Sequence, residues 1–146
     1  MKKRISLMGE VLVDLIENNK LNFSPVPGGA IFNTTNTLSK LGVLTSFYSQ
    51  IGDDYWGRYI LQEMIKNGID HNFIKVDKLF KTPLAFATLD KSGNAVYDFY
   101  KSKFDYHIQT NDLYNTGIFF YGSFFSVMDE NQKNIEKIIA TSKREK

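Results

Sequence analysis

Strand-like runs and helix-like segments alternate along this chain, and this alternation restricts the fold more than any other feature. Strand-like residues occupy 4–9, 11–16, 43–52, 72–76 and 117–123, and helix-like residues occupy 29–41, 53–68 and 129–143. Two further alternating runs, 83–90 and 95–101, flank the turn residues Ser92-Gly93-Asn94 and predict a hairpin. We therefore expect an α/β fold, a layered sheet with helices on both faces, and a second small sheet around the hairpin.

The run "GIFFYGS" at 117–123 is continuously apolar and ends in Gly122-Ser123. Such a run is typical of a strand that is buried on both faces of a parallel sheet. Ligands of open α/β sheets bind beyond the carboxyl ends of the strands, so Gly122 and Ser123 are predicted to lie near a ligand. Residues 17–27 are polar and contain prolines, which predicts a loop or an edge strand.

Composition and charge exclude several classes of function. The 146 residues fit one domain, and the net charge of +2 is scattered, so a nucleic-acid partner is not expected. The chain has no cysteine, and its two histidines, His71 and His107, lack metal-ligand spacing and receive no role. No segment approaches 18 consecutive apolar residues, so no membrane partner is expected and a soluble, cytoplasmic protein is predicted.

Residues 28–42, "GGAIFNTTNTLSKLG", predict a helix that follows two glycines and ends at Gly42. Its first half carries five poor helix formers, Asn33 to Thr37, which together cost a few kcal/mol relative to alanine. The later leucines, Leu38 and Leu41, are expected to face the sheet. Gly28 and Gly29 lack a Cβ, so a ligand could lie against their backbone near the helix start. Asn33 lies one turn further and offers two donors and an acceptor.

Three acids in the first half of the chain, Asp14, Asp53 and Asp54, have open interpretations. Asp14 stands between Val13 and Leu15 in a strand, where it either faces outward or accepts hydrogen bonds from ligand hydroxyls. Asp53 and Asp54 directly precede a helix, where a cap and a first-turn acid are more common than a metal site. The chain lacks both G-x-G-x-x-G and G-K-[ST], which argues against a dinucleotide-binding Rossmann domain.

Five segments, in this order and spacing, resemble the N-terminal part of the PfkB (ribokinase-like) carbohydrate kinases, in their fructokinase and 2-keto-3-deoxygluconate kinase branch. They are "GEVLVDLIE" (9–17), "GGAIFNTTNTLSKLG" (28–42), "IGDDYWGRYILQEMIKNGID" (51–70), "TPLAFATLDKSGNAVYDFYK" (82–101) and "IFFYGS" (118–123). The resemblance implies that residues 1–146 form the N-terminal part of a ribokinase-like domain. It also implies a β-lid built from strands at about 12–27 and 82–101.

The resemblance also implies a site for a sugar. The residues that match the family's sugar-binding positions are Asp14, Gly28, Gly29 and Asn33. Tyr100 matches an aromatic residue of the lid near the sugar. Lys101 stands where many members have arginine, and lysine cannot reproduce the bidentate contact of arginine to an acid sugar.

The implied function is the sugar-binding portion of an ATP-dependent kinase that phosphorylates a fructose-like hexose or a keto-deoxy sugar acid. The family's catalytic aspartate belongs to a G-A-G-D motif that is absent from these residues, so no catalytic residue is assigned and the chain alone is expected to be inactive. ATP and Mg²⁺ would serve the complete enzyme without binding this chain tightly. The alternative is a non-catalytic module that binds sugar or forms a homodimer through the β-lid or an exposed sheet edge.

Overall fold

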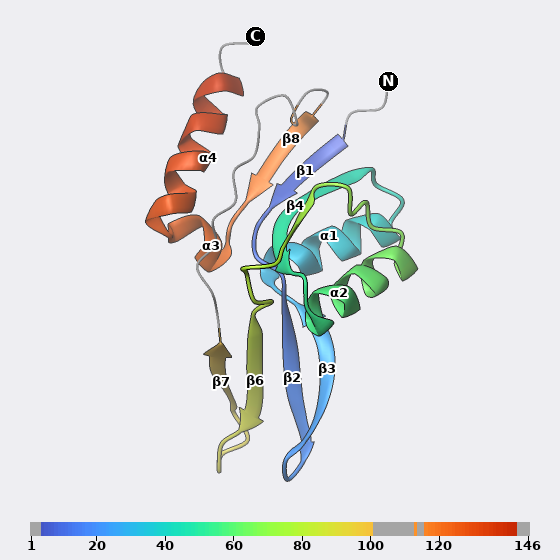
Figure 1. Cartoon of the computed structure of the whole chain (residues 1–146), viewed down its shortest axis with the longest axis vertical. Helices are drawn as coiled ribbons and strands as arrows, with labels where there is room; N and C mark the ends of the chain where they lie inside the picture. Colours follow the sequence, from blue (N-terminus) through green and yellow to red (C-terminus); the bar gives the residue numbers. More distant parts are fainter. Residues whose placement is uncertain (1–3, 101–112, 114–115, 143–146) are drawn as a thin grey trace.

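A computed structural model of the chain describes residues 4–100, 113 and 116–142. It contains two sheets (Figure 1). The main sheet has the order β5-β4-β1-β8, and its strands, all parallel, are β1 (Arg4–Met8), β4 (Thr45–Gly52), β5 (Ile74–Asp77) and β8 (Thr116–Tyr121). The lid sheet has the order β3-β2-β6-β7, formed by β2 (Leu12–Asn19), β3 (Asn22–Gly28), β6 (Leu84–Leu89) and β7 (Ala95–Tyr100).

The helices cover both faces of the main sheet, as the sequence predicts. Figure 1 shows α1 and α2 on one side and α4 on the other. Neighbouring residues of a strand point to opposite faces, so Leu7 packs in the cluster with α1 and α2, and Met8 packs in the cluster with α4. The helices are α1 (Ala30–Lys40), α2 (Tyr55–Lys66), the short α3 (Ser123–Val127) and α4 (Asp129–Ser142).

Strand β4 explains why this sheet forms where it does. All eight of its residues are buried, with Phe47 on the α1 side and Tyr48 on the α4 side. Each such large apolar side chain contributes about 1.5–3 kcal/mol when it leaves water. Helix α2 adds Ile60 and Met64, which lie one helical turn apart and are fully buried, whereas the apolar Ile65 beside them is 60% exposed.

The polar first half of α1 has a local explanation that the sequence analysis did not find. The hydroxyls of Thr34, Thr35 and Thr37 each donate to the carbonyl four residues earlier, at 2.8–3.0 Å. Such bonds satisfy the hydroxyl inside the helix, so these threonines do not need a ligand. Asn33 is exposed and is the residue of this run that a ligand could meet.

The end of α1 agrees with the prediction at one residue and differs at another. Gly42 has φ 76°, and its N–H donates to the carbonyl of Ser39, so the expected left-handed glycine is present. Leu38 packs against the core, but Leu41 is 73% exposed and does not face the sheet. The helix ends before Leu41, so this residue no longer follows the apolar stripe.

Strand β8 differs from the prediction that it is buried on both faces. In the described part of the chain it pairs only with β1, at the end of the sheet order, and it leaves Ile118, Phe120 and Tyr121 between 40% and 57% exposed. Its apolar composition is that of a central strand, but its position is that of an edge strand. The burial prediction was therefore wrong for this chain.

Two local features at the C-terminal side also differ from expectation. No local pattern indicates α3, a short helix that begins at Ser123. An aspartate at the start of the helix-like run 129–143 favours a cap, but the carbonyl of Met128 accepts the N–H groups of Asn131 and Gln132, so Asp129 is the first helical residue. Ile135 and Ile138 are buried.

A cluster of hydrogen bonds around Asp54 ties the lid sheet to the main sheet. Asp54 accepts the N–H of Gly57 at 2.9 Å and so caps α2, as predicted. It also accepts the N–H of Thr82 at 2.9 Å and its hydroxyl at 2.8 Å. Thr82 Oγ1 in turn accepts the N–H of Gly52. Because Thr82 lies two residues before the start of β6, this cluster fixes the point where the chain enters the lid.

Replacing Asp54 by alanine is expected to lower the free energy of unfolding by about 1–3 kcal/mol, because three donors lose a charged acceptor. Hydrogen bonds from Thr82 and Gly57 hold the pKa of the Asp54 carboxyl below its ordinary value of 3.8 despite partial burial. A carboxyl whose pKa is lower in the folded than in the unfolded state stabilises the fold fully at pH values above its unfolded-state pKa. This stabilisation is lost as the pH falls through its folded-state pKa. The difference between wild type and Asp54→Ala, measured by urea unfolding, should therefore shrink below about pH 4.

Candidate functional site

Asp14 lies in β2 at the point where the lid sheet leaves the main sheet, directly beside Gly28. A Cβ atom built on Gly28 would overlap the Oδ2 atom of Asp14. The absence of a side chain at Gly28 therefore makes the room that the Asp14 carboxylate occupies. The structure brings together these two residues, which stand 14 positions apart in the sequence.

The Asp14 carboxylate is half-buried, and burial raises the pKa of this carboxyl above its ordinary value of 3.8. Among the described residues, none forms a hydrogen bond or ion pair with it. A desolvated carboxylate without a protein partner is unfavourable for stability and is often found where a ligand supplies the hydrogen bonds.

Gly29 and Asn33 continue the site onto α1. Gly29 precedes the helix with φ 109°, and a Cβ atom there would lie 2.6 Å from the carbonyl oxygen of Glu10, so both the conformation and the space favour glycine. The carbonyl of Gly29 accepts the N–H of Asn33 at 2.9 Å, which places Asn33 one turn above it with its side chain exposed.

Tyr100 points to the other face of the lid. Strand register places Asp14 beside Ala85, and Ala85 beside Phe99, so these three residues share one face. Tyr100 pairs with Leu84, and its ring lies 5.4 Å from that of Phe86 in an edge-to-face contact on the opposite face. Lys101, and with it His107, lies outside the described residues.

Phe99 and Tyr97 are the residues that sequence reasoning missed. Both are 50% exposed, and their rings stack with centroids 5.9 Å apart on the Asp14 face. The strand period of two could have found them, because Phe99 differs from Tyr100 by one position and hence by one face. An acid and exposed aromatic rings on one face of a sheet suit the hydroxyls and the C–H face of a sugar.

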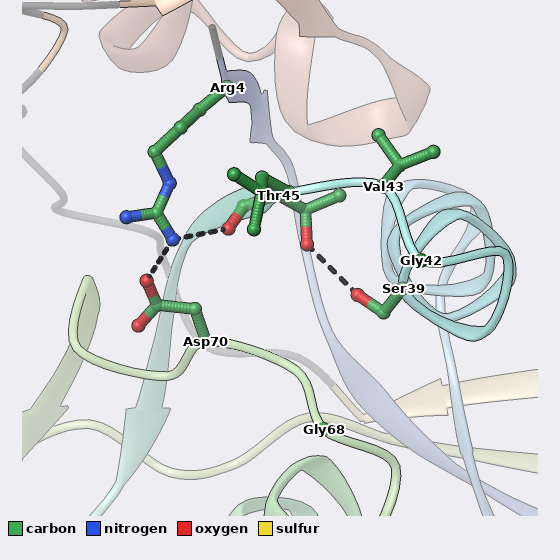
Figure 2. A pocket seen from close by; sticks show the side chains of 8 residues that line it. Arg4, Ser39, Gly42, Val43, Thr45, Gly68 and Asp70 are labelled. Atoms are coloured by element: carbon green, nitrogen blue, oxygen red, sulfur yellow. Dashed lines mark hydrogen bonds and ion pairs between the residues drawn. The ribbon is translucent and has the colours of Figure 1, made fainter. Parts of the chain in front are cut away.

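A second hollow lies at the other end of the main sheet (Figure 2). It has a volume of about 190 Å³ and is lined by residues at the amino ends of β1 and β4 and after α1 and α2. Arg4 already donates to the Thr45 carbonyl at 3.0 Å and pairs with Asp70 at 2.5 Å, so the two charges offset each other. We assign this hollow no ligand.

The described residues offer no metal site in this region or elsewhere: no three of their acids and histidines come together closely enough to hold a metal ion. Nor is any of the described helices both long and apolar enough to cross a membrane.

A parallel sheet with helices on both faces and an attached lid sheet is the arrangement of the ribokinase-like α/β class. Comparisons with known proteins agree with this class. The chain matches the model of the pfkB family carbohydrate kinases over residues 2–142. It therefore belongs to the PfkB family of carbohydrate kinases.

Named relatives in this family are fructokinases. Fructokinase-1 of Zea mays is 30% identical over 128 residues, which are 79% of this chain and 40% of that protein. The Escherichia coli fructokinase is 26% identical over 114 residues, 77% of this chain and 37% of that protein. The chain thus spans well under half the length of these relatives.

Solved structures give the same fold. A fructokinase from Xylella fastidiosa with bound ATP superposes with a TM-score of 0.87 at 22% identity, over 98% of this chain and 46% of that one. A sugar kinase from Pyrococcus horikoshii in complex with ATP gives a TM-score of 0.79 at 28% identity, over 94% and 49% of the two chains.

Replacing Asp14 by asparagine is expected to leave the free energy of unfolding at pH 7 equal to or above that of wild type. A carboxyl whose folded pKa is raised supports the fold only while protonated, and this contribution is lost as the pH rises through the folded pKa. Asparagine removes the desolvated charge at neutral pH. Thermal unfolding at pH 7 and pH 4 measures this, and a large loss of stability at pH 7 would show that Asp14 has a structural role instead.

Proposed function

We propose that residues 1–146 form the sugar-binding portion of an ATP-dependent carbohydrate kinase, and that the sugar is a fructose-like hexose. The observation that carries the proposal is the desolvated Asp14 carboxylate, which bonds to none of the described residues, beside Gly28 and on the same face of the lid sheet as Phe99. The fructokinase names of the relatives favour fructose over a keto-deoxy sugar acid.

The proposed roles follow from the chemistry of each side chain. Asp14 accepts hydrogen bonds from two sugar hydroxyls, and Asn33 donates to and accepts from a third. Gly28 and Gly29 let the sugar approach the backbone, and Phe99 covers its apolar side. Lys101 stays a predicted contact. Tyr100, on the far face of the lid, is a weaker candidate than Phe99.

In the complete enzyme these residues would orient one sugar hydroxyl for attack on the γ-phosphate of ATP. Phosphoryl transfer depends on positioning and on stabilising charge at the phosphate, which requires a base, an anion site and a nucleotide site. Among the described residues, no three acids or histidines come together to hold Mg²⁺. This chain alone is proposed to bind sugar without phosphorylating it, and its cytoplasmic location remains a prediction.

Replacing Gly28 by alanine is expected to abolish fructose binding while the chain stays folded. The new methyl group would displace the Asp14 carboxylate, which can move, and the backbone at Gly28 has no positive φ that would strain alanine. Replacing Asn33 by alanine removes one or two sugar hydrogen bonds and should weaken binding at least tenfold. Isothermal titration calorimetry with fructose, with far-UV circular dichroism for folding, measures both.

Thr34→Ala is the matched control, since its hydroxyl is already bonded to the Ala30 carbonyl within the same helix. Equal affinity in wild type, Gly28→Ala and Asn33→Ala would place the sugar elsewhere. Release of ADP on incubation with ATP and any hexose would contradict the proposed inactivity of the chain. Absence of sugar binding would favour the alternative, a module that acts only by pairing.

We also propose that the chain self-associates, through the open edge of β8 or through the lid. An exposed apolar edge strand invites pairing with another chain, and lysine on such an edge opposes it. Ile118→Lys tests the β8 edge, and Val96→Lys, at a comparably exposed position on β7, tests the lid edge. Multi-angle light scattering should give a dimer for wild type and a monomer for one of the two variants; a wild-type monomer would rule out both interfaces.

A further inference from the structure

Glu10 is a buried acid that the proposed sugar contacts do not use. It lies two residues after the end of β1, and the residue as a whole is only 4% exposed. A buried carboxylate is costly unless it is hydrogen-bonded, so its position has to be specified by partners. One of these partners is Ser123, whose Oγ donates to Glu10 Oε1 at 3.1 Å although the two residues are 113 positions apart.

Ser123 holds an unfavourable backbone conformation. Its φ is 67°, in the left-handed region that residues other than glycine and asparagine rarely adopt. Such residues persist only where their surroundings hold them, and they gather at functional sites. The hydroxyl bond to Glu10 and the bond from Ser126 Oγ to the Ser123 carbonyl, at 2.8 Å, provide this restraint at the start of α3.

The backbone around Glu10 and Ser123 also supports the first turn of α1. The Glu10 carbonyl lies against Gly29, where a Cβ atom would come within 2.6 Å. In the same turn, Ile31 packs against Gly9 and Gly122, the residues that precede Glu10 and Ser123. A Cβ atom built on Gly9 would lie 2.6 Å from Ile31 Cβ, and one built on Gly122 would lie 3.3 Å from Ile31 Cδ1. The residues that directly follow β1 and β8 thus pack against this turn and support it.

We propose that Glu10 is a positioning residue for the sugar site: its carboxylate fixes the left-handed Ser123, and its backbone supports Gly29, so that Gly29 and Asn33 keep one arrangement relative to β1 and β8. This inference rests on the proposed function, since it concerns the same site. A merely structural role for the Glu10–Ser123 bond would change stability alone. A positioning role changes the geometry at Gly29 and Asn33, which Ser123 does not itself bond.

Ser123→Gly separates these two roles. Glycine adopts φ 67° without strain, and this gain opposes the loss of the hydrogen bond to Glu10, so the melting temperature of this variant should stay close to that of wild type. Glycine cannot bond to Glu10, so the backbone amide signals of Gly29 and Asn33 in ¹⁵N NMR spectra of the sugar-free chain should shift and broaden. The fructose dissociation constant should rise about tenfold, as for other residues that act through a ligand-binding neighbour.

Two further variants complete the design. Glu10→Gln keeps an acceptor oxygen for Ser123 and should keep the Gly29 and Asn33 signals closer to wild type than Ser123→Gly does. Thr141→Ala is the control, because its hydroxyl bonds only to the Lys137 carbonyl within α4, and it should leave both signals unchanged.

The outcomes distinguish this inference from the proposed function. Unchanged Gly29 and Asn33 signals in Ser123→Gly would overturn the positioning role, whatever the sugar affinity. Absence of fructose binding by wild type would overturn the proposed function, while the NMR comparison, which uses no sugar, would still decide whether Glu10 positions Gly29 and Asn33.

Discussion

The fold depends on the short crossing at residues 9–11, where the chain passes from the main sheet into the lid sheet. All three residues are buried, and only they separate the end of β1 from the start of β2. So short a connection leaves little freedom in how the two sheets lie relative to each other. It passes beneath Gly29 and Ile31, so the first turn of α1 is fixed to the same point. The candidate sugar site lies where the three parts meet.

A second connection keeps the lid in place from the other side. Asp54, at the end of β4, receives hydrogen bonds from Thr82, and the Pro83 carbonyl accepts the N–H of Val13 in β2. The lid is therefore held at both of its entries from the main sheet. Asp14 stands between these two connections with no described partner, and burial raises the pKa of its carboxyl, which disfavours the charged form at neutral pH. Ligand-binding residues often lower the stability of the fold in this way, and they need rigid surroundings to hold their positions.

Much of the fold could be predicted because its elements have strong local signals. The β and α periods, the left-handed Gly42 and the Asp54 cap act within a few residues, and the structure agrees with each. The errors have long-range causes. The burial of β8 depends on neighbours on both sides, and its sequence does not reveal that it is an edge strand here. Tyr100, which was matched by position, stays a prediction; the strand register places it on the face of the lid opposite Asp14 and places Phe99 on the Asp14 face.

By itself, the sequence determined the α/β class, the order of the elements and the residues that match the PfkB family, because periodicity and motif spacing are properties of the chain. The tertiary structure decided which of these residues meet. Gly28 makes room for Asp14, and Glu10 reaches Ser123, because strands distant in the sequence become neighbours in the sheets. No local pattern encodes such contacts, since they arise from the packing of whole elements, and the candidate site is made of them.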